Sequence, residues 1–237
     1  GDFVANDRER FVVASKYTHA MPSVKDPNFG GNHRKNLTQS LDASLKRLNL
    51  DYIDLYWVHA WDFTTPVEEV MRALDDAVRA GKISHIGFSD TPAWITARAN
   101  TLAQFHGWTP VSALQLEYSL LERSIERELI PMARSMDIAV TAWSPLGGGV
   151  LTGKYTRDGF DDGNKRLDTV SFRQLDEESL RVAKQVDAIA DQLGVSSAQV
   201  SLAWVRQKGA LAIIGARSLT QLNDNIESLK LQLSTEQ

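Results

Sequence analysis

Short apolar stretches rich in β-branched and aromatic residues alternate along the chain with longer stretches of helical periodicity. Each short stretch has the length and composition of a buried strand rather than of a helix. The six strands predicted in this way are Phe11–Lys16, Ile53–His59, Ile83–Phe88, Ala113–Tyr118, Ile138–Trp143 and Leu211–Gly215. Strands that alternate with helices predict βα units around a parallel sheet.

The stretches between the strands repeat apolar residues at the spacing of one helix face. Leu37, Leu41, Leu45 and Leu48 mark one such helix, and Val70, Leu74, Ala77 and Val78 mark another. Capping signals predict helix starts at Thr65-Pro66-Val67-Glu68, at Thr91-Pro92, at Ser196 with Gln199 and at Ser218 with Gln221. Glycine just past a helix predicts the helix ends at Gly81 and Gly194.

No linker rich in Pro or Ser interrupts this pattern, so we expect residues 1–237 to form a single domain. Two parallel architectures fit. A doubly wound sheet that binds dinucleotides would carry Gly-x-Gly-x-x-Gly after its first strand, and the sequence contains no such motif. A TIM-type (β/α)8 barrel instead predicts functional residues at the carboxyl ends of many strands. We therefore expect the barrel.

A complete barrel of this type has eight βα units, whereas the pattern predicts about six. Residues Gly1–Arg10 are too few for two more units. We therefore expect an N-terminally truncated barrel or an open variant, with unpaired edges at Phe11–Lys16 and Leu211–Gly215. Exposed strand edges pair with other chains, so the chain is expected either to form a homo-oligomer through these edges or to be substantially disordered.

Composition narrows the class of protein. The 237 residues are 24% charged and 43% hydrophobic, which excludes a disordered chain. A net charge of −4 and a pI near 5.8 argue against a nucleic-acid binder. The absence of cysteine excludes disulfides and thiolate metal sites, and no metal site is expected. No apolar run is as long as a bilayer span, and Gly1–Val4 does not resemble a signal peptide, so we expect a cytoplasmic protein that does not contact a membrane.

The first two strands deliver Lys16 and His59 at their carboxyl ends. Because side chains alternate along a strand, Leu55, Trp57 and His59 share one face. If that face points into the barrel, His59 lies at the rim beside Lys16. Both side chains can donate hydrogen bonds to the negative charge that develops on a carbonyl oxygen. A solvated lysine and an ordinary rim histidine are the alternative interpretation.

The later strand ends carry groups suited to a nucleotide. They are Ser89-Asp90, Gln115, the segment Trp143–Gly149 and Arg217. Tryptophan offers a stacking face, glycines let backbone N–H groups approach phosphate oxygens, and an arginine before a capped helix favours an anion. Taken singly, the glycines could form a flexible loop and the arginine could cap the helix. Their order on successive strand ends favours nucleotide binding.

Six stretches carry a resemblance to a known family. They are Val12–Lys16, Leu48–Leu55 with His59, Gly81–Asp90, Gln115–Leu121, Ala142–Tyr155 and Ile214–Asn225. In this order they resemble the aldo-keto reductases, (β/α)8 barrels that reduce aldehydes and ketones with NADPH. The similarity is to the bacterial and potassium-channel-β-subunit-like branch. The resemblance therefore implies an oxidoreductase with a small-molecule carbonyl substrate.

The resemblance also assigns residues. It implies that Lys16 and His59 are two members of the catalytic tetrad. The implied NADPH-binding residues are Ser89, Asp90 and Gln115 at the carboxamide, Trp143 stacked on the nicotinamide, Ser144, Leu146, Gly147 and Lys154 around the pyrophosphate, and Gly215, Arg217, Gln221, Asp224 and Asn225 at the adenosine and 2′-phosphate. Asp90 stands where the family usually has asparagine, which departs from its pattern.

The other two tetrad members, an aspartate and the proton-donating tyrosine, precede the lysine in the family, in a stretch that Gly1–Arg10 does not contain. Tyr17 and Tyr56 should point away from the site, and Tyr118 and Tyr155 could approach it only by rearrangement. Loss of a general acid typically costs on the order of 10²–10⁴ in rate. The sequence thus leaves three hypotheses open. They are a weakened NADPH-dependent reductase of small or aromatic aldehydes and ketones, a catalytically impaired NADP(H)-binding or regulatory module, and a non-functional fragment.

Overall fold

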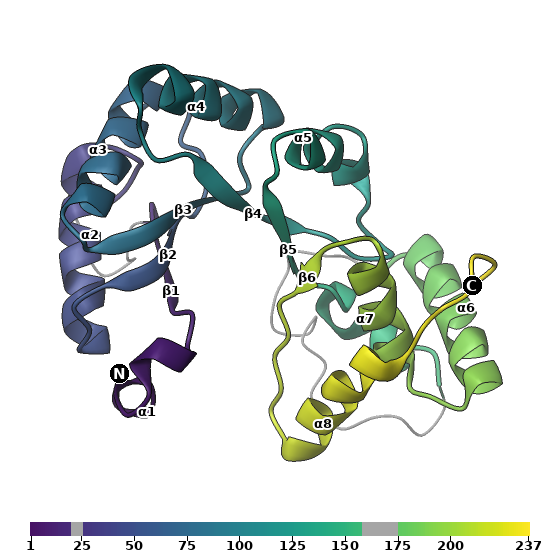
Figure 1. Cartoon of the computed structure of the whole chain (residues 1–237). Helices are drawn as coiled ribbons and strands as arrows, with labels where there is room; N and C mark the ends of the chain where they lie inside the picture. Colours follow the sequence, from purple (N-terminus) through teal and green to yellow (C-terminus); the bar gives the residue numbers. More distant parts are fainter. Residues whose placement is uncertain (20–25, 158–174) are drawn as a thin grey trace. The chain divides into compact units, whose positions relative to one another are not determined.

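The structure is a computed structural model that describes residues 1–19, 26–157 and 175–237. In these residues six strands follow one another in the sheet in the order β1-β2-β3-β4-β5-β6 (Figure 1). Their bounds are β1 Ala14–Tyr17, β2 Ile53–Val58, β3 Ile83–Ser89, β4 Val111–Glu117, β5 Ala139–Trp143 and β6 Leu211–Ala212. The pairings from β1 to β4 and between β5 and β6 are all parallel. The predicted parallel α/β sheet is confirmed.

Helices connect the strands. The α-helices are α1 Asp2–Ala5, α2 Arg34–Leu48, α3 Val67–Arg79, α4 Ala93–His106, α5 Leu129–Ser135, α6 Glu177–Leu193, α7 Ser197–Gln207 and α8 Leu219–Glu227. The 3-10 helices are η1 Arg8–Arg10, η2 Ser124–Glu126, η3 Gly147–Thr152 and η5 Ser228–Lys230. Each predicted strand has its counterpart, although the expected last strand shortens to the two residues of β6.

The chain forms two compact units. Unit 1 comprises Gly1–Gln115 and Glu128–Ala139, and unit 2 comprises Leu116–Arg127 and Val140–Gln237. The chain therefore passes from unit 1 to unit 2 within β4, returns to unit 1 between Arg127 and Glu128, and passes to unit 2 again within β5. A single domain, closure into a barrel, N-terminal truncation and oligomerisation all stay predictions.

In unit 1, α2, α3 and α4 lie on one face of β1, β2 and β3 (Figure 1). The strand register places Lys16 opposite Trp57, Trp57 opposite Gly87, and Gly87 opposite Ala113. Trp57 is 2% exposed, and its ring lies against Gly87 so closely that a Cβ there would be 2.3 Å from Trp57 Cε3. In this row the large Trp57 ring is followed by two small residues, Gly87 and Ala113, which leave room for the ring to pack against the sheet.

Candidate site residues lie in the next row of the sheet, towards the carboxyl ends of the strands. Ser89 pairs with Gln115 across β3 and β4, and His59 follows Val58, which pairs with Phe88. His59 N donates a hydrogen bond of 3.0 Å to the carbonyl oxygen of Tyr17. Parallel register therefore brings His59, Ser89 and Gln115 to one edge of this part of the sheet.

In unit 2, η3 packs against α6 and α7. Val150 and Leu151 of η3 are fully buried, in a cluster with the α6 residues Ala183, Val186 and Ala190 and the α7 residues Val200 and Ala203. Small alanines let the helices approach η3 closely. The segment that follows β5 is thus part of the core of unit 2.

Two of the predicted helix caps are wrong. α3 and α4 have Pro66 and Pro92 as their N-cap residues, with no side-chain cap. The hydroxyl of Thr65 donates to Asp62 Oδ2 at 2.7 Å, and that of Thr91 donates to the carbonyl oxygen of Ser89 at 2.9 Å. Both hydroxyls stabilise the loops before the helices instead.

The other helix signals are confirmed. Ser196 and Ser218 cap α7 and α8 by accepting hydrogen bonds from the backbone N–H groups of Gln199 and Gln221. Gly81 and Gly194 follow α3 and α6 with φ of 70° and 66°, a left-handed conformation that glycine adopts without strain.

The contact between Trp57 and Gly87 gives a stability test. We expect Gly87→Ala to destabilise the protein by about 1–3 kcal/mol, because the added methyl group overlaps the buried indole ring. Urea denaturation followed by tryptophan fluorescence measures the change. Gly215→Ala is the control, because a Cβ at Gly215 meets no atom within 4 Å. Equal unfolding midpoints for the two variants would contradict the packing argument.

Candidate active site

Lys16 and Gln115 are in direct contact in unit 1. The Lys16 ammonium donates a hydrogen bond to Gln115 Oε1 and lies 5.8 Å from the centroid of the Trp57 ring. Burial lowers the pKa of Lys16, and the carboxylate of Asp90 opposes that effect. An ammonium that is partly desolvated is a stronger hydrogen-bond donor and a better acid than an ordinary lysine.

His59 lies beside Lys16. The hydrogen bond from its backbone N–H to the carbonyl oxygen of Tyr17 fixes its position. Its N–H also lies 3.2 Å from Thr18 Oγ1, and its ring makes an edge contact with His19 at 4.3 Å between centroids. Burial, the Lys16 ammonium and His19 together lower the pKa of His59 to about 4. The imidazole is therefore neutral near pH 7, with one N–H to donate and one nitrogen to accept.

Ser89 presents a buried hydroxyl at the end of β3. The residue is 1% exposed, and within the part of the chain that the structure describes its Oγ has no hydrogen-bond partner. The next residue, Asp90, has φ of 43° and donates its N–H to the carbonyl oxygen of Gln115 at 3.2 Å. A buried hydroxyl without a partner costs free energy unless a ligand satisfies it, which fits a site for an amide-bearing cofactor.

The tyrosines considered as proton donors are engaged elsewhere. Tyr17 and Tyr56 stack on one another at 5.6 Å, and Tyr17 OH donates to the carbonyl oxygen of Asn32. Tyr118 OH donates to Glu126 Oε1 at 2.7 Å, and Tyr155 packs against the core cluster of unit 2. Burial also raises the pKa of Tyr17 well above its ordinary value, which makes it a poor acid.

Two loop residues that the sequence reasoning missed hold the segment after His59. Asp62 Oδ2 accepts a 2.7 Å hydrogen bond from Asn32 N, and Asp62 N donates to Asn32 Oδ1 at 3.0 Å. Burial opposes ionisation of Asp62, but hydrogen bonds from Thr65, Asn32 and Thr64 lower its pKa to about 2. Asp62 begins the run Asp62-Phe63-Thr64-Thr65-Pro66, and an aspartate shortly before threonines and a proline is a turn signal that could have identified it. Nothing in the sequence pointed to His19 as a neighbour of His59.

In unit 2 the segment after β5 is tightly turned. Ser144 has φ of 54°, and its Oγ accepts a 3.2 Å hydrogen bond from the N–H of Gly148. Gly147 has φ of 58°, and a Cβ there would be 2.7 Å from Leu121 Cδ1. Leu146 is the N-cap residue of η3, Trp143 ends β5, and Lys154 follows η3. The predicted pyrophosphate segment is therefore a compact turn whose shape requires glycine.

The remaining candidate cofactor-binding residues lie in the loop before α8 and in α8 itself. Arg217, which is exposed, donates its backbone N–H to Gln221 Oε1 at 2.9 Å. Asn225 Nδ2 donates to the carbonyl oxygen of Gly215 at 3.3 Å. Asp224 instead accepts hydrogen bonds from α7, from Ser196 Oγ at 2.7 Å and from Gln199 Nε2 at 2.6 Å. Gln221 and Asn225 thus shape the loop around Gly215, while Asp224 ties α8 to α7.

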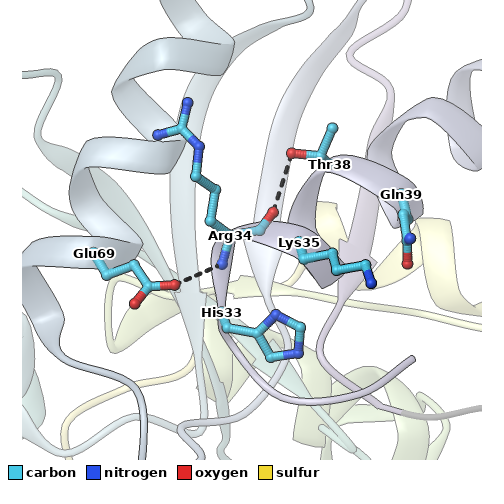
Figure 2. A pocket seen from close by; sticks show the side chains of 6 residues that line it. All are labelled: His33, Arg34, Lys35, Thr38, Gln39 and Glu69. Atoms are coloured by element: carbon cyan, nitrogen blue, oxygen red, sulfur yellow. Dashed lines mark hydrogen bonds between the residues drawn. The ribbon is translucent and has the colours of Figure 1, made fainter. Parts of the chain in front are cut away.

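A separate pocket of about 600 Å³ lies where α2 begins (Figure 2). It is lined by His33, Arg34, Lys35, Thr38, Gln39 and Glu69. Glu69 Oε1 accepts a 3.0 Å hydrogen bond from the Arg34 N–H, and the Arg34 guanidinium lies 2.7 Å from Asp76. Because these groups pair within the protein and none is a strand-end candidate, we do not assign this pocket to the active site.

The described residues contain neither a candidate metal centre nor a candidate membrane span. Across residues 1–19, 26–157 and 175–237, no three His, Asp or Glu side chains cluster as metal ligands. In the same ranges no helix is long and apolar enough to cross a bilayer.

Residues 1–237 match the model of the aldo/keto reductase family. The chain belongs to this family. It is 38% identical to norsolorinic acid reductase of Emericella nidulans and 37% identical to norsolorinic acid reductase A of Aspergillus parasiticus, in each case over 100% of the chain. It is also 37% identical, over its full length, to an aryl-alcohol dehydrogenase of Pestalotiopsis microspora.

These relatives correct one expectation. All three are fungal proteins, and they give no support to a bacterial or channel-β-subunit-like branch. The chain spans 61–62% of the length of these relatives. The roles assigned to individual residues stay predictions.

The low pKa of His59 in this family member predicts a pH-dependent stability. The unfolded imidazole has its ordinary pKa of 6.5 and the folded one about 4, so between these values the unfolded chain binds more protons. The free energy of unfolding should therefore fall as pH drops through this window. His59→Gln should reduce that fall by about 1 kcal/mol, allowing for the partial exposure of the ring.

Urea denaturation near neutral pH and near pH ~5 measures the difference. The matched control is His85→Gln, which makes the same substitution at a histidine that is exposed on β3. An identical pH dependence in His59→Gln and the wild type would show that the pKa of His59 is not depressed.

Proposed function

We propose that this protein is an NADPH-dependent oxidoreductase that reduces aldehydes and ketones to alcohols. The family and the reductase and dehydrogenase names of its relatives support the reaction class. The names of two kinds of relative refer to norsolorinic acid and to aryl alcohols, which supports an aromatic carbonyl compound as the substrate. The observation that carries the proposal is the cluster of Lys16, His59 and Gln115 at the strand ends of unit 1.

In the proposed reaction, Lys16 and His59 bind the carbonyl oxygen. The ammonium of Lys16 and the N–H of the neutral His59 ring both donate hydrogen bonds to the oxygen, where negative charge develops. The lowered pKa of Lys16 brings its acidity closer to neutral pH, which favours transfer of a proton to that oxygen. When bound, NADPH supplies the hydride that adds to the carbonyl carbon.

The strand ends of unit 1 also fit the carboxamide of that cofactor. Ser89 Oγ needs a partner, as described above. Gln115 Oε1 is occupied by Lys16, so its amide nitrogen is the group with which Gln115 would donate to a carboxamide oxygen. Asp90 adds a carboxylate at the same edge.

In unit 2, Trp143 would stack on the nicotinamide, and Ser144, Leu146, Gly147 and Lys154 would surround the pyrophosphate. Gly215, Arg217, Gln221, Asp224 and Asn225 would bind the adenosine end. An exposed arginine before a helix N-terminus attracts a phosphate, so Arg217 is proposed to select NADPH over NADH.

Turnover tests the proposed reaction. We expect the protein to oxidise NADPH in the presence of an activated aromatic aldehyde, followed by the loss of NADPH absorbance. His59→Ala should lower kcat by about 10²-fold or more, because it removes a donor that acts on the developing charge. His85→Ala, which alters an exposed histidine, is the matched control and should retain the wild-type kcat.

Other outcomes separate the alternatives. Binding of NADPH without turnover of any aldehyde would instead indicate a catalytically impaired NADP(H)-binding or regulatory module. Absence of NADPH binding would refute both functions.

Cofactor choice is tested separately. Arg217→Ala should raise the Kd for NADPH about tenfold, because one charged contact to the 2′-phosphate is lost, and should leave the Kd for NADH within about twofold. Fluorescence titration measures both constants. An equal loss of affinity for the two dinucleotides would show that Arg217 does not read the 2′-phosphate.

A further inference from the structure

Unit 2 contains a buried acid that the proposed reaction does not use. Asp187 lies in the second half of α6 and is 8% exposed. A carboxylate removed from water is stable only when donors or cations surround it. Its partners therefore show what the residue holds together.

The partners of Asp187 come from two other segments. Ser197, the first residue of α7, donates its hydroxyl to Asp187 Oδ1 at 2.5 Å. Thr156 donates its hydroxyl to Asp187 Oδ2. The carboxylate thus links α6, α7 and the segment after η3.

Arg157 completes the cluster. Its Nε lies 3.4 Å from Asp187 Oδ1, and its Nη1 lies 2.8 Å from Asp191 Oδ1, one turn further along α6. Its Nη2 donates to the backbone carbonyl oxygen of Asp187 at 3.1 Å. Two consecutive residues, Thr156 and Arg157, are therefore fixed to α6 by charge-assisted hydrogen bonds, which are the stronger kind.

The residues fixed in this way close a short turn. The N–H groups of Thr156 and Arg157 donate to the carbonyl oxygen of Gly153 at 3.2 and 3.0 Å. Gly153 has φ of 87°, and a Cβ there would be 3.2 Å from Arg157 Nε. Lys154 lies within this turn, so its backbone position depends on the residues that Asp187 holds.

We propose that Asp187 is a positioning residue for cofactor binding. It fixes the turn Gly153–Arg157 to α6 and α7 and thereby holds Lys154 where it contacts the diphosphate of NADPH. The inference rests on the proposed function, because it takes Lys154 as a phosphate ligand. A cation whose backbone is already ordered binds a phosphate with a smaller loss of entropy.

The test compares two ligands. NADPH carries the diphosphate, whereas adenosine 2′-monophosphate carries the adenosine and the 2′-phosphate without it. Asp187→Asn should raise the Kd for NADPH about tenfold and leave the Kd for adenosine 2′-monophosphate within about twofold. Thr156→Val should also weaken NADPH binding, and Thr156→Ser, which keeps the hydroxyl, should restore it. Isothermal titration calorimetry measures both constants.

The matched control is another buried, ion-paired aspartate. Asp75 is 1% exposed and lies 2.6 Å from Arg79, in unit 1. Asp75→Asn removes the same charge from a similar environment and should leave both Kd values unchanged. A second control tests whether Asp187 acts through Lys154. In a Lys154→Ala background, Asp187→Asn should change the Kd for NADPH by less than about twofold, because the two residues act through one contact.

The outcomes are distinguishable. Unchanged NADPH affinity in Asp187→Asn and Thr156→Val would overturn the positioning role while leaving the proposed function intact. Equal weakening of both ligands, or an undiminished effect in the Lys154→Ala background, would also overturn it. A wild-type protein that binds neither ligand would refute the proposed function, and this inference with it. If Asp187→Asn does not fold, the Thr156→Val and Thr156→Ser pair decides the question.

Discussion

The missing side chain at Gly87 is the packing constraint on which the arrangement of unit 1 depends. Trp57 can lie inside the sheet because the position opposite it on β3 has no Cβ. Lys16, opposite Trp57 on the other side, then runs along the indole face and reaches Gln115 in the next row. A bulky ring, a glycine and a long cationic side chain thus form one packed layer under the candidate catalytic groups.

That layer also explains the electrostatics of the site. Lys16 and His59 are both partly removed from water, and the Lys16 ammonium disfavours the charged form of His59. Burial lowers both pKa values, and the carboxylate of Asp90 offsets the effect only at Lys16. One group therefore remains cationic while its neighbour is neutral. A pair of donors with different charge is suited to an oxygen whose charge changes during a reaction.

The strands could be predicted from sequence because burial on both faces requires short apolar runs, which stand out from the helical stretches. The caps at Ser196 and Ser218 could be predicted because capping is local. The caps at Thr65 and Thr91 failed because nearby loop acceptors, Asp62 and the carbonyl oxygen of Ser89, take those hydroxyls. The contact of Lys16 with Gln115 joins residues 99 positions apart, and it follows only once the register of four strands is known. The proximity of His19 to His59 depends on loop conformation, which composition does not encode.

The division of the chain between two units has a consequence for its synthesis. Unit 1 needs Glu128–Ala139, which contains α5, yet Leu116–Arg127 of unit 2 is made before it. Unit 1 therefore cannot be completed until the unit 2 segment Leu116–Arg127 has also been synthesised. Apolar strand surface that is not yet covered is the state in which aggregation competes with folding. The order of the segments along the chain thus makes the folding of unit 1 wait for residues that a contiguous unit would already contain.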